Sequence, residues 1–391
     1  MPPKYNFIDL FCGIGGFHQA LSSLGHECVF ASDKDKHCRE TYKLNYTIEP
    51  AGDITKVVPE SIPSFDILCA GFPCQPFSHA GYQQGFEDSR GNLFWNICRI
   101  VEHHNPRYMI LENVKNLATH DKGNTWKIIK NNIDALGYHT YSDVLILNTL
   151  HLNVPQNRER VLILCKRKDL GELPPRPTIP KKSTLRMTRA VADIIIEQPR
   201  DTMSAKHVEC ERIWNAFVKL LIDNNVETPK FPIWTEYFDV VPPENDPKYV
   251  KYKNWIDKNR KLYTEHPFLR QWLVDSRKSE RWTGAVRKME WQTGNFEAGD
   301  CLNRHLWSLR PSGIRVKKAD YVPTLVAMNQ TPVYGPERRM LSPRELLRCQ
   351  SFPDDFQYDE SRIFKQVGNA VNVDMIKAAA RFLIHDYDLL T

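Results

Sequence analysis

Cys74 stands in a pattern that suits nucleophilic attack on a ring. It lies between Pro73 and Pro76 in GFPCQPFSHAG, directly after the apolar run of residues 65–71. A thiol of ordinary pKa is only about 3% thiolate at neutral pH, so a nucleophilic cysteine needs a setting that holds and activates it. The prolines restrict the backbone, and a turn after a buried strand brings the thiol to the edge of a sheet. No histidine is placed as in a Cys-His-Asn protease, which leaves a soft electrophile such as C6 of a pyrimidine.

Polar groups that could act on the same ring end other strands. Glu112 and Asn113 end the predicted strand RYMILEN, at the carboxyl edge of the sheet where Cys74 is expected. Arg158 and Arg160 alternate in PQNRER, so in an extended segment both lie on one face while Glu159 points away. Guanidinium and carboxyl groups there can hydrogen-bond one ligand. The structural alternatives are an exposed cap for Glu112 and a salt bridge for the arginines.

A glycine turn and three acids suggest a nucleotide-like ligand at this edge. The turn in DLFCGIGG ends one predicted strand and opens a helix, where backbone N–H groups can receive an anionic group. Its Gly-x-Gly-Gly spacing differs from that of dinucleotide binders, which disfavours a nicotinamide oxidoreductase. Asp33 and Asp35 follow the next predicted strand, where ribose hydroxyls are bound in such sheets, and Asp53 lies in the turn beyond. Helix capping is the alternative role for each aspartate.

Short apolar runs alternate with helical periodicity from residue 5 to about 168. The predicted strands are YNFIDLF, ECVFAS, FDILCAGF, RYMILEN, SDVLILN and RVLILCKR, and the predicted helices cover 17–24, 36–44, 92–103 and 125–136. This alternation predicts an α/β, doubly wound domain with a mostly parallel sheet between helices. SPRELLRCQSF and VDMIKAAARFLIHDYDLL are predicted as later helices, and we expect the last one to pack on this domain.

The proline-rich run LGELPPRPTIPKK marks a domain boundary, after which the pattern becomes irregular apart from a predicted helix over 208–222. Residues 171–335 contain 27 Lys and Arg against 20 Asp and Glu, whereas the whole chain has 53 against 47. The segment also holds seven of the nine tryptophans. Cations mixed with aromatics suit a polyanion with exposed bases, while a tryptophan core under solvated lysines is the alternative.

Composition limits the class of protein. Hydrophobic residues at 41% and charged residues at 26% are ordinary for a globular protein. The ten cysteines are scattered and include no Cys-x-x-Cys pair, so we expect a reducing compartment, no disulfides and no metal. No apolar run approaches the roughly 20 residues of a membrane span, and the first residues do not resemble a signal peptide. We therefore expect a cytoplasmic protein.

Seven stretches together resemble the C5-cytosine-specific DNA methyltransferase family. They are FIDLFCGIGGF, GFPCQPFS, SRGNLF, LENV, PQNRERV, SPRELLRCQSFPDDF and KQVGNAV, in the family's order and spacing. The resemblance implies a Rossmann-like, S-adenosylmethionine-dependent domain over 1–170, completed by 340–391, and a smaller, irregular target-recognition domain over 171–339. It also implies methyl transfer from S-adenosylmethionine to C5 of a flipped cytosine in a short duplex DNA sequence, through a covalent bond between Cys74 and C6.

The resemblance assigns site residues by position. Cys74 matches the nucleophile, Glu112 the acid that bonds N3 and N4 of the cytosine, and Arg160 the group on its O2, with Arg158 nearby. The implied cofactor neighbours are Phe11, Gly13, Gly15, Gly16, Asp33, Asp53, Ile54, Pro73, Leu93, Asn369 and Val371. The implied DNA contacts are Ser78, Arg304, Arg310, Arg315, Lys317, Lys318 and Thr324. The position of Asp33 is more often Glu in the family, and Lys34 stands where an apolar neighbour of the adenine can occur.

Two alternatives stay open. The first is a transfer-RNA cytosine methyltransferase of the same fold, although such relatives usually carry a Cys-Phe-Thr tripeptide that this chain lacks. The second is a catalytically silent DNA-binding relative, which would not need Cys74, Glu112 and Arg160 together. The expected partner is double-stranded DNA without a membrane. We expect a stand-alone monomer in the bacterial nucleoid or a virus-infected host cell, paired with a restriction endonuclease for the same site. The target sequence follows from no transferable code.

Overall fold

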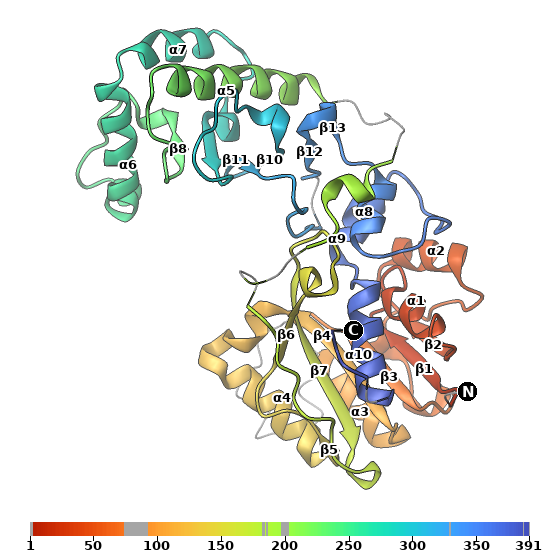
Figure 1. Cartoon of the computed structure of the whole chain (residues 1–391). Coiled ribbons are helices and arrows are strands. Elements are labelled where there is room, and N and C mark those ends of the chain that lie inside the picture. Colours follow the sequence, from red (N-terminus) through yellow and green to blue (C-terminus); the bar gives the residue numbers. More distant parts are fainter. Residues whose placement is uncertain are drawn as a thin grey trace. The chain divides into compact units, whose positions relative to one another are not determined.

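The computed structural model describes residues 3–73, 93–181, 184, 187–196, 203–327, 330–385 and 387–390. They group into two compact units, one of residues 1–189, 323–328 and 343–391, and one of residues 190–322 and 329–342 (Figure 1). The expected boundaries were 170/171 and 339/340. The proline-rich segment stays with the first unit, where the hydroxyl of Tyr141 donates a hydrogen bond to the carbonyl of Pro174.

A seven-stranded sheet forms the centre of the first unit, in the order β2-β1-β3-β4-β7-β5, with β6 also paired to β7. The strands are β1 (Asn6–Leu10), β2 (Glu27–Ser32), β3 (Ile67–Gly71), β4 (Tyr108–Val114), β5 (Tyr138–His139), β6 (Leu145–Asn148) and β7 (Glu159–Arg167). The first four pair in parallel, whereas β7 is antiparallel to β4, β5 and β6. The sheet is therefore mixed, because the short connection from β6 to β7 allows an antiparallel pair but no parallel crossover.

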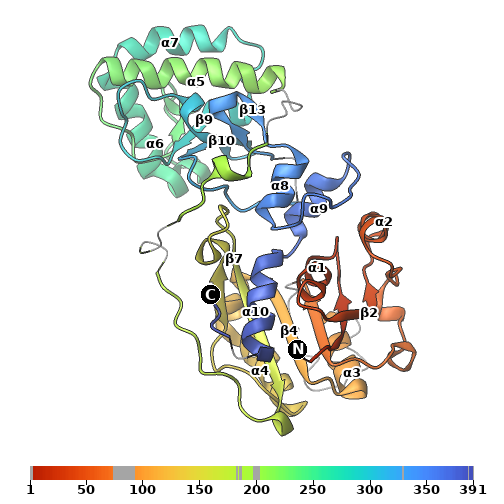
Figure 2. The same ribbon diagram turned by 45° about the vertical axis from the view of Figure 1, so that its right-hand side comes forward.

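Helices cover both faces of this sheet, which confirms the predicted α/β, doubly wound fold. Those beside the sheet are α1 (Gly16–Ser22), α2 (Lys36–Asn45), α3 (Leu93–His104), α4 (Asn124–Ala135) and α10 (Val373–His385). The unit also contains α8 (Pro343–Cys349) and α9 (Ile363–Asn369), which contact each other. Helices α3 and α4 share one apolar core with alternate strand residues. Helix α10 lies along the sheet beside α1 and contacts β4 and β7, as Figure 2 shows. The predicted packing of the last helix on this domain is confirmed.

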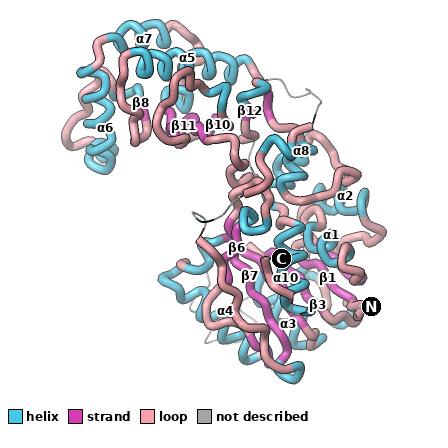
Figure 3. The backbone as a smooth tube through the Cα atoms, viewed as in Figure 1, coloured by secondary structure: helices cyan, strands magenta, loops and turns pink. Residues whose placement is uncertain are grey.

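The second unit has more regular structure than its sequence indicated. Its helices are α5 (Ala205–Asp223), α6 (Pro247–Glu265) and α7 (Phe268–Arg277). Its sheet has the order β13-β12-β10-β11-β9-β8. The strands are β8 (Ile233–Trp234), β9 (Lys288–Trp291), β10 (Leu306–Arg310), β11 (Gly313–Lys317), β12 (Val333–Tyr334) and β13 (Arg339–Met340). Figure 3 shows β8, β11, β10 and β12 in magenta below α5. The predicted helix over 208–222 lies within α5. Strands β8, β12 and β13 have only two residues each, and β9 pairs with segments distant in the sequence, so local patterns do not reveal them. The hairpin of β10 and β11 is local and was missed by the sequence analysis.

One face of this second sheet is covered and holds the apolar core. Its core residues on β10 and β11 are Trp307, Leu309, Ile314 and Val316, packed with α5 and α7. Five of the seven tryptophans of this region lie in that core, namely Trp214, Trp272, Trp282, Trp291 and Trp307. For those five tryptophans the alternative interpretation, that they form a core, is therefore correct. Trp234 is half-buried and Trp255 is 38% exposed.

No helix within the described ranges has the length and apolar character that crossing a bilayer requires.

Candidate active site

The backbone that leads to Cys74 leaves the sheet beside Glu112. Gly71, the last residue of β3, pairs in register with Glu112 of β4. The buried Phe72 follows, and its carbonyl accepts a hydrogen bond of 2.8 Å from the side-chain amide of Asn113. Asn113 is itself only 2% exposed, so this contact anchors the chain immediately before Pro73. Cys74 lies outside the described residues, as does Ser78.

Sequence reasoning placed Asn113 at the strand end but gave it no role. The only available signal was its position next to a strand-terminal acid. Its amide contact depends on a residue 41 positions earlier, which no local pattern reveals.

Glu112 and Arg160 form an ion pair, so the salt-bridge alternative is realised for Arg160. They come from the antiparallel strands β4 and β7, and Arg160 Nε lies 2.8 Å from Glu112 Oε1. The two side chains are only 10% and 12% exposed, respectively. Burial raises the pKa of Glu112, while the positive charges of Arg160 and Arg158 act to lower it. The carboxyl group is thus held in one orientation and keeps a proton more readily than an exposed glutamate.

Arg158 uses its donors differently. It is 1% exposed, and its guanidinium donates to the carbonyls of Leu325 at 3.2 Å, Gly368 at 3.2 Å and Ala370 at 2.6 Å. Burial lowers its pKa to about 9, with a further contribution from Arg160. Arg158 immediately precedes β7 whereas Arg160 is within it, and only Arg160 forms an ion pair with Glu112. Arg158 joins two late segments of the chain to β7.

The carboxylate of Asp33 is hydrogen-bonded to the glycine turn that follows β1. Phe11, Gly13 and Gly15 have positive φ angles of 56°, 53° and 90°. The amide of Gly13 donates to Asp33 Oδ2 at 2.8 Å, and the amide of Asp35 donates to Asp33 Oδ1 at 2.7 Å. Burial raises the pKa of Asp33, and these two hydrogen bonds oppose that shift. The turn and the end of β2 are therefore joined at Asp33.

The third expected acid lies close to this junction. The amide of Asp33 donates to the carbonyl of Ala51, which brings the following turn alongside β2. There Asp53 caps the short helix Ile54–Lys56 by accepting from the amide of Thr55, and Ile54 is buried. Lys34 Nζ lies 3.6 Å from Asp53 Oδ2. The capping alternative for Asp53 is thus realised, and its carboxylate also faces Lys34.

A buried polar cluster packs against the glycine turn. The sequence analysis did not predict this cluster. Asp9 is fully buried, and its Oδ2 accepts a hydrogen bond of 3.3 Å from the amide of His18. Burial raises the pKa of Asp9 well above its ordinary value. The ring of Tyr46 stacks on His18 at a centroid distance of 3.8 Å, and its hydroxyl donates to the carbonyl of Gly15. These contacts hold the turn in one conformation.

Gly16 is required by close packing against Val371. A Cβ at Gly16 would lie 2.5 Å from Val371 Cγ2 and 2.7 Å from its carbonyl oxygen. We expect Gly16→Ala to destabilise the protein by about 1 to 3 kcal/mol through overpacking. Thermal unfolding followed by circular dichroism would measure this. Gly52→Ala is the matched control, because a Cβ there meets nothing within 4 Å. Equal melting temperatures for the two variants would contradict the close contact.

The expected DNA contacts divide between the two units. Alternation along β10 and β11 places Arg310, Arg315 and Lys317 on the sheet face opposite the apolar core. Arg315 Nε pairs with Glu290 Oε2 at 2.8 Å. Thr324 belongs to the first unit, where its hydroxyl donates to the carbonyl of Asn157 at 2.6 Å.

The remaining two, Arg304 and Lys318, lie near that sheet but outside its strands. Arg304 ends a short helix before β10 and donates to the carbonyl of Ala298, and Lys318 follows β11. Among the described side chains there is no group of three or more His, Cys, Asp or Glu that could hold a metal ion.

Sequence comparison finds one matching family model and several named relatives. The model of the C-5 cytosine-specific DNA methylases matches residues 5–385. The type II methyltransferase M.HgiCI of Herpetosiphon aurantiacus is 32% identical, over 98% of each chain. M.DsaV of Dactylococcopsis salina is 30% identical, over 99% of this chain and 88% of the relative. M.HhaI of Haemophilus parahaemolyticus is 52% identical over 165 residues, which are 42% of this chain and half of that relative.

Solved structures with a similar fold cover almost the whole chain. A putative DNA modification methyltransferase from an Escherichia coli prophage superposes with a TM-score of 0.55 and 19% identity, over 98% of this chain and 99% of its own. A DNMT2 mutant from Spodoptera frugiperda gives a TM-score of 0.53 and 17% identity, over 97% of this chain and 99% of its own. At these identities the likeness shows a shared fold.

Proposed function

Because this chain belongs to the C-5 cytosine-specific DNA methylase family, we propose that it transfers a methyl group from S-adenosylmethionine to C5 of a cytosine in duplex DNA. The observation that carries the proposal is the buried Glu112 carboxyl, held 2.8 Å from Arg160 beside the strand end that leads to Cys74. Full-length type II relatives support action on one short sequence within a restriction-modification system.

Cys74 is the proposed nucleophile. Its thiolate adds to C6 of the cytosine, and the electrons of the C5–C6 double bond make C5 nucleophilic. C5 would then bond to the methyl carbon, and the sulfur of the cofactor would keep the electron pair of the broken bond and leave as a neutral thioether. Loss of the C5 proton to water would return its electron pair to the C5–C6 bond and expel the Cys74 thiolate. The C6 atom is out of reach inside a stacked duplex, so the cytosine must be flipped out. Asn113, through the carbonyl of Phe72, positions the backbone immediately before Pro73.

Glu112 and Arg160 are proposed to act on the flipped base. A protonated Glu112 gives a proton or a hydrogen bond to N3, which draws charge from the ring while Cys74 adds to C6. The raised pKa of this buried carboxyl supports that role. Arg160 orients Glu112 and donates to O2 of the base. Arg158 is proposed as a positioning residue, because its guanidinium binds three backbone carbonyls.

The residues after β1 and β2 fit S-adenosylmethionine. Asp33 offers a carboxylate to ribose hydroxyls, and Asp53 with the buried Ile54 offers acceptor and apolar groups to the adenine. A Cβ at Gly13 meets nothing within 4 Å, so the turn leaves space for a ligand. The remaining proposed neighbours are Phe11, Gly15, Gly16, Pro73, Leu93, Asn369 and Val371. When bound, this cofactor supplies an electrophilic methyl group on a positively charged sulfur.

Asp33 is expected to control cofactor affinity. We expect Asp33→Ala to weaken binding of S-adenosylmethionine at least about tenfold, since two ribose hydrogen bonds to a charged acceptor are lost. Asp33→Glu should retain affinity within a few-fold. Isothermal titration calorimetry would measure both. Asp35→Ala is the matched control, because Asp35 caps α2 through the amide of His37. Equal losses for the Asp33 and Asp35 alanine variants would exclude a direct contact.

Methyl transfer itself tests the proposed function. Purified protein with tritiated S-adenosylmethionine is expected to label duplex DNA. Label in transfer RNA alone would favour the RNA alternative, and label in neither would favour a catalytically silent DNA-binding protein. Bisulfite sequencing of plasmid DNA from expressing cells should then show one short motif methylated almost completely. We propose that the second unit reads this motif, with Arg310, Arg315 and Lys317 on its open sheet face.

A further inference from the structure

The two tryptophans outside the second core lie together beside α6. The ring of Trp234, on β8, meets the rings of Tyr252 and Trp255 edge-on, at centroid distances of 5.4 and 5.6 Å. Tyr252 and Trp255, both on α6, are nearly parallel, with an angle of 10° and centroids 5.7 Å apart. Trp255 is 38% exposed, so the cluster reaches the surface. Figure 1 shows α6 next to β8 at one end of the sheet.

Lysines surround this aromatic cluster. The ammonium groups of Lys248 and Lys288 lie 5.9 and 5.2 Å from the ring centroid of Trp234, and that of Lys251 lies 5.2 Å from the centroid of Tyr252. Helix α6 carries six Lys and Arg residues against two acids, a surplus of four positive charges. The chain as a whole has a net charge of +6. One helix thus concentrates much of the positive charge of the protein.

Two of these cations are free of carboxylates on an exposed stripe. Lys258 follows Trp255 by three residues, so the two lie on one side of α6. Lys251 stands before a kink at Tyr252, and its ammonium group contacts the Tyr252 ring that stacks on Trp255. Neither Lys251 nor Lys258 forms an ion pair with any described residue. Lys248, in contrast, pairs with Glu236 at 2.9 Å. The stripe therefore presents uncompensated charge to solvent.

The aromatic cluster is continuous with the open face of the second sheet. Trp234 pairs in register with Lys288 of β9, and Glu290, two residues further on, pairs with Arg315 of β11. Side chains of residues that pair directly lie on the same face of a sheet. For Trp234, Lys288, Glu290 and Arg315 this is the face opposite the apolar core. We call the surface formed by Trp234, Lys248, Lys251, Tyr252, Trp255, Lys258 and Lys288 the α6 ledge.

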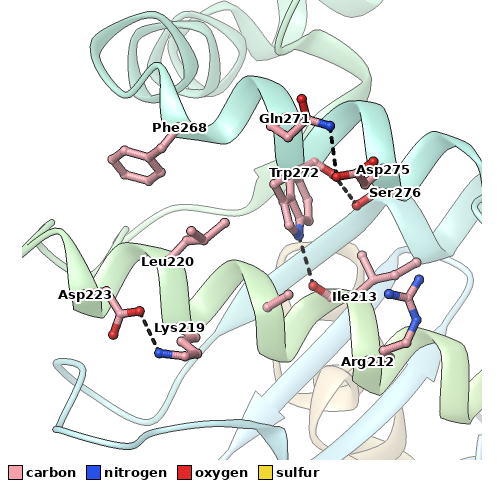
Figure 4. Close-up of a pocket in the computed structure, with 11 residues that line it drawn as sticks. Arg212, Ile213, Lys219, Leu220, Asp223, Phe268, Gln271, Trp272, Asp275 and Ser276 are labelled. Atoms are coloured by element: carbon pink, nitrogen blue, oxygen red, sulfur yellow. Dashed lines mark hydrogen bonds and ion pairs between the residues drawn. The ribbon is translucent and has the colours of Figure 1, made fainter.

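A cavity elsewhere in this unit lacks these properties. A cavity of about 440 Å³ lies between α5 and α7, with Ile213, Leu220 and Phe268 among its lining residues (Figure 4). Its charges are compensated, since Lys219 pairs with Asp223 at 2.6 Å in the same helix. It also lies on the helical side of the sheet. The surplus charge and the exposed aromatic ring are both on the α6 ledge instead.

We propose that the α6 ledge binds the phosphate backbone of duplex DNA that flanks the recognition sequence. This inference rests on the proposed function, because its ligand is the same DNA duplex that the adjoining sheet face is proposed to bind. Ammonium groups are point charges without the geometry that distinguishes bases, so the contact is independent of sequence. Each phosphate neutralised makes affinity more sensitive to salt. The exposed ring of Trp255 adds apolar contact with the sugars between the phosphates.

Charge removal on the stripe tests the proposal. The variant K251Q/K258Q removes two charges that form no ion pair with a described residue, and K219Q/K278Q removes two from α5 and the residue after α7 as the matched control. Fluorescence anisotropy would measure binding to mixed-sequence duplexes of about 30 and about 12 base pairs over a range of salt concentrations. For the long duplex we expect K251Q/K258Q to bind roughly tenfold more weakly than the wild type. The slope of log affinity against log salt concentration should become less steep by up to about 2. The control should change neither.

The outcomes separate this inference from the proposed function. Equal effects of the two double variants, or an unchanged salt slope in K251Q/K258Q, would overturn the α6 ledge as a DNA contact even if the protein methylates DNA. A larger loss for single-stranded RNA than for duplex DNA would also overturn it. Specific loss of long-duplex binding in a protein that transfers no methyl group would support the ledge and refute the proposed function. Because Lys251 and Lys258 are exposed, folding of the variant should be unaffected.

Discussion

Replacing Cys74 with serine is expected to abolish methyl transfer, with kcat lowered by at least about three orders of magnitude. A hydroxyl keeps nearly the same shape but is almost wholly protonated at neutral pH and is a far weaker nucleophile than a thiolate. Affinity for S-adenosylmethionine and DNA should change little. Filter-binding of tritiated DNA under single-turnover conditions would measure the step. Turnover near that of the wild type would refute the covalent mechanism.

A substrate with 5-fluorocytosine tests the same step by trapping it. Fluorine cannot leave C5 as a proton does, so the adduct between Cys74 and C6 should survive denaturation. Peptide mapping should then locate the label on Cys74.

The other described cysteines are poor competitors for the adduct, because most of them are buried. Eight of the nine described cysteines are buried, and burial raises the pKa of Cys28 and Cys98, for example, to about 12. Cys301 is the partly exposed one, so Cys301→Ser is the matched control and should leave the adduct unchanged. An adduct that maps to any cysteine other than Cys74 would overturn the assignment.

Glu112→Gln is expected to lower kcat by about two to three orders of magnitude, since a positioned proton donor contributes on that scale. The amide can still donate a hydrogen bond to N3 but has no proton to transfer. Glu159→Gln is the matched control, because Glu159 is on the adjoining strand and pairs with Lys115 at the surface. Cofactor affinity should be unchanged in both variants. An equal loss of cofactor binding in Glu112→Gln would make this residue a cofactor ligand or a structural cap.

The pH profile gives a second measure of Glu112. Burial raises the pKa of its carboxyl, so the protonated form persists to higher pH than in an exposed glutamate. The protonated fraction falls as pH rises through that pKa, and kcat should fall with it. This alkaline limb should be absent in Glu112→Gln, which does not titrate. A limb that persists unchanged in the variant would assign the titration to another group.

Much of the first unit could be predicted from local sequence. Hydrophobic periodicity located β1, β2, β3 and β4 and the helices after them, because each signal depends on residues only a few positions apart. The position of Glu112 near the end of β4 followed from the same periodicity. Glycines and prolines marked the turns, since they restrict or extend the backbone conformations available locally.

Tertiary structure alone decided which partners these residues meet. Arg158 and Arg160 have the same local pattern, yet Arg160 binds Glu112 while Arg158 binds carbonyls of Leu325 and Gly368, up to 210 residues away. The same holds for tryptophans in the second unit, where identical side chains became either core or surface. The sequence determined which residue types stand at each strand end and helix face. Contacts between distant segments determined burial and pairing, because desolvation and hydrogen-bond geometry depend on the complete packed environment and not on neighbours in the chain.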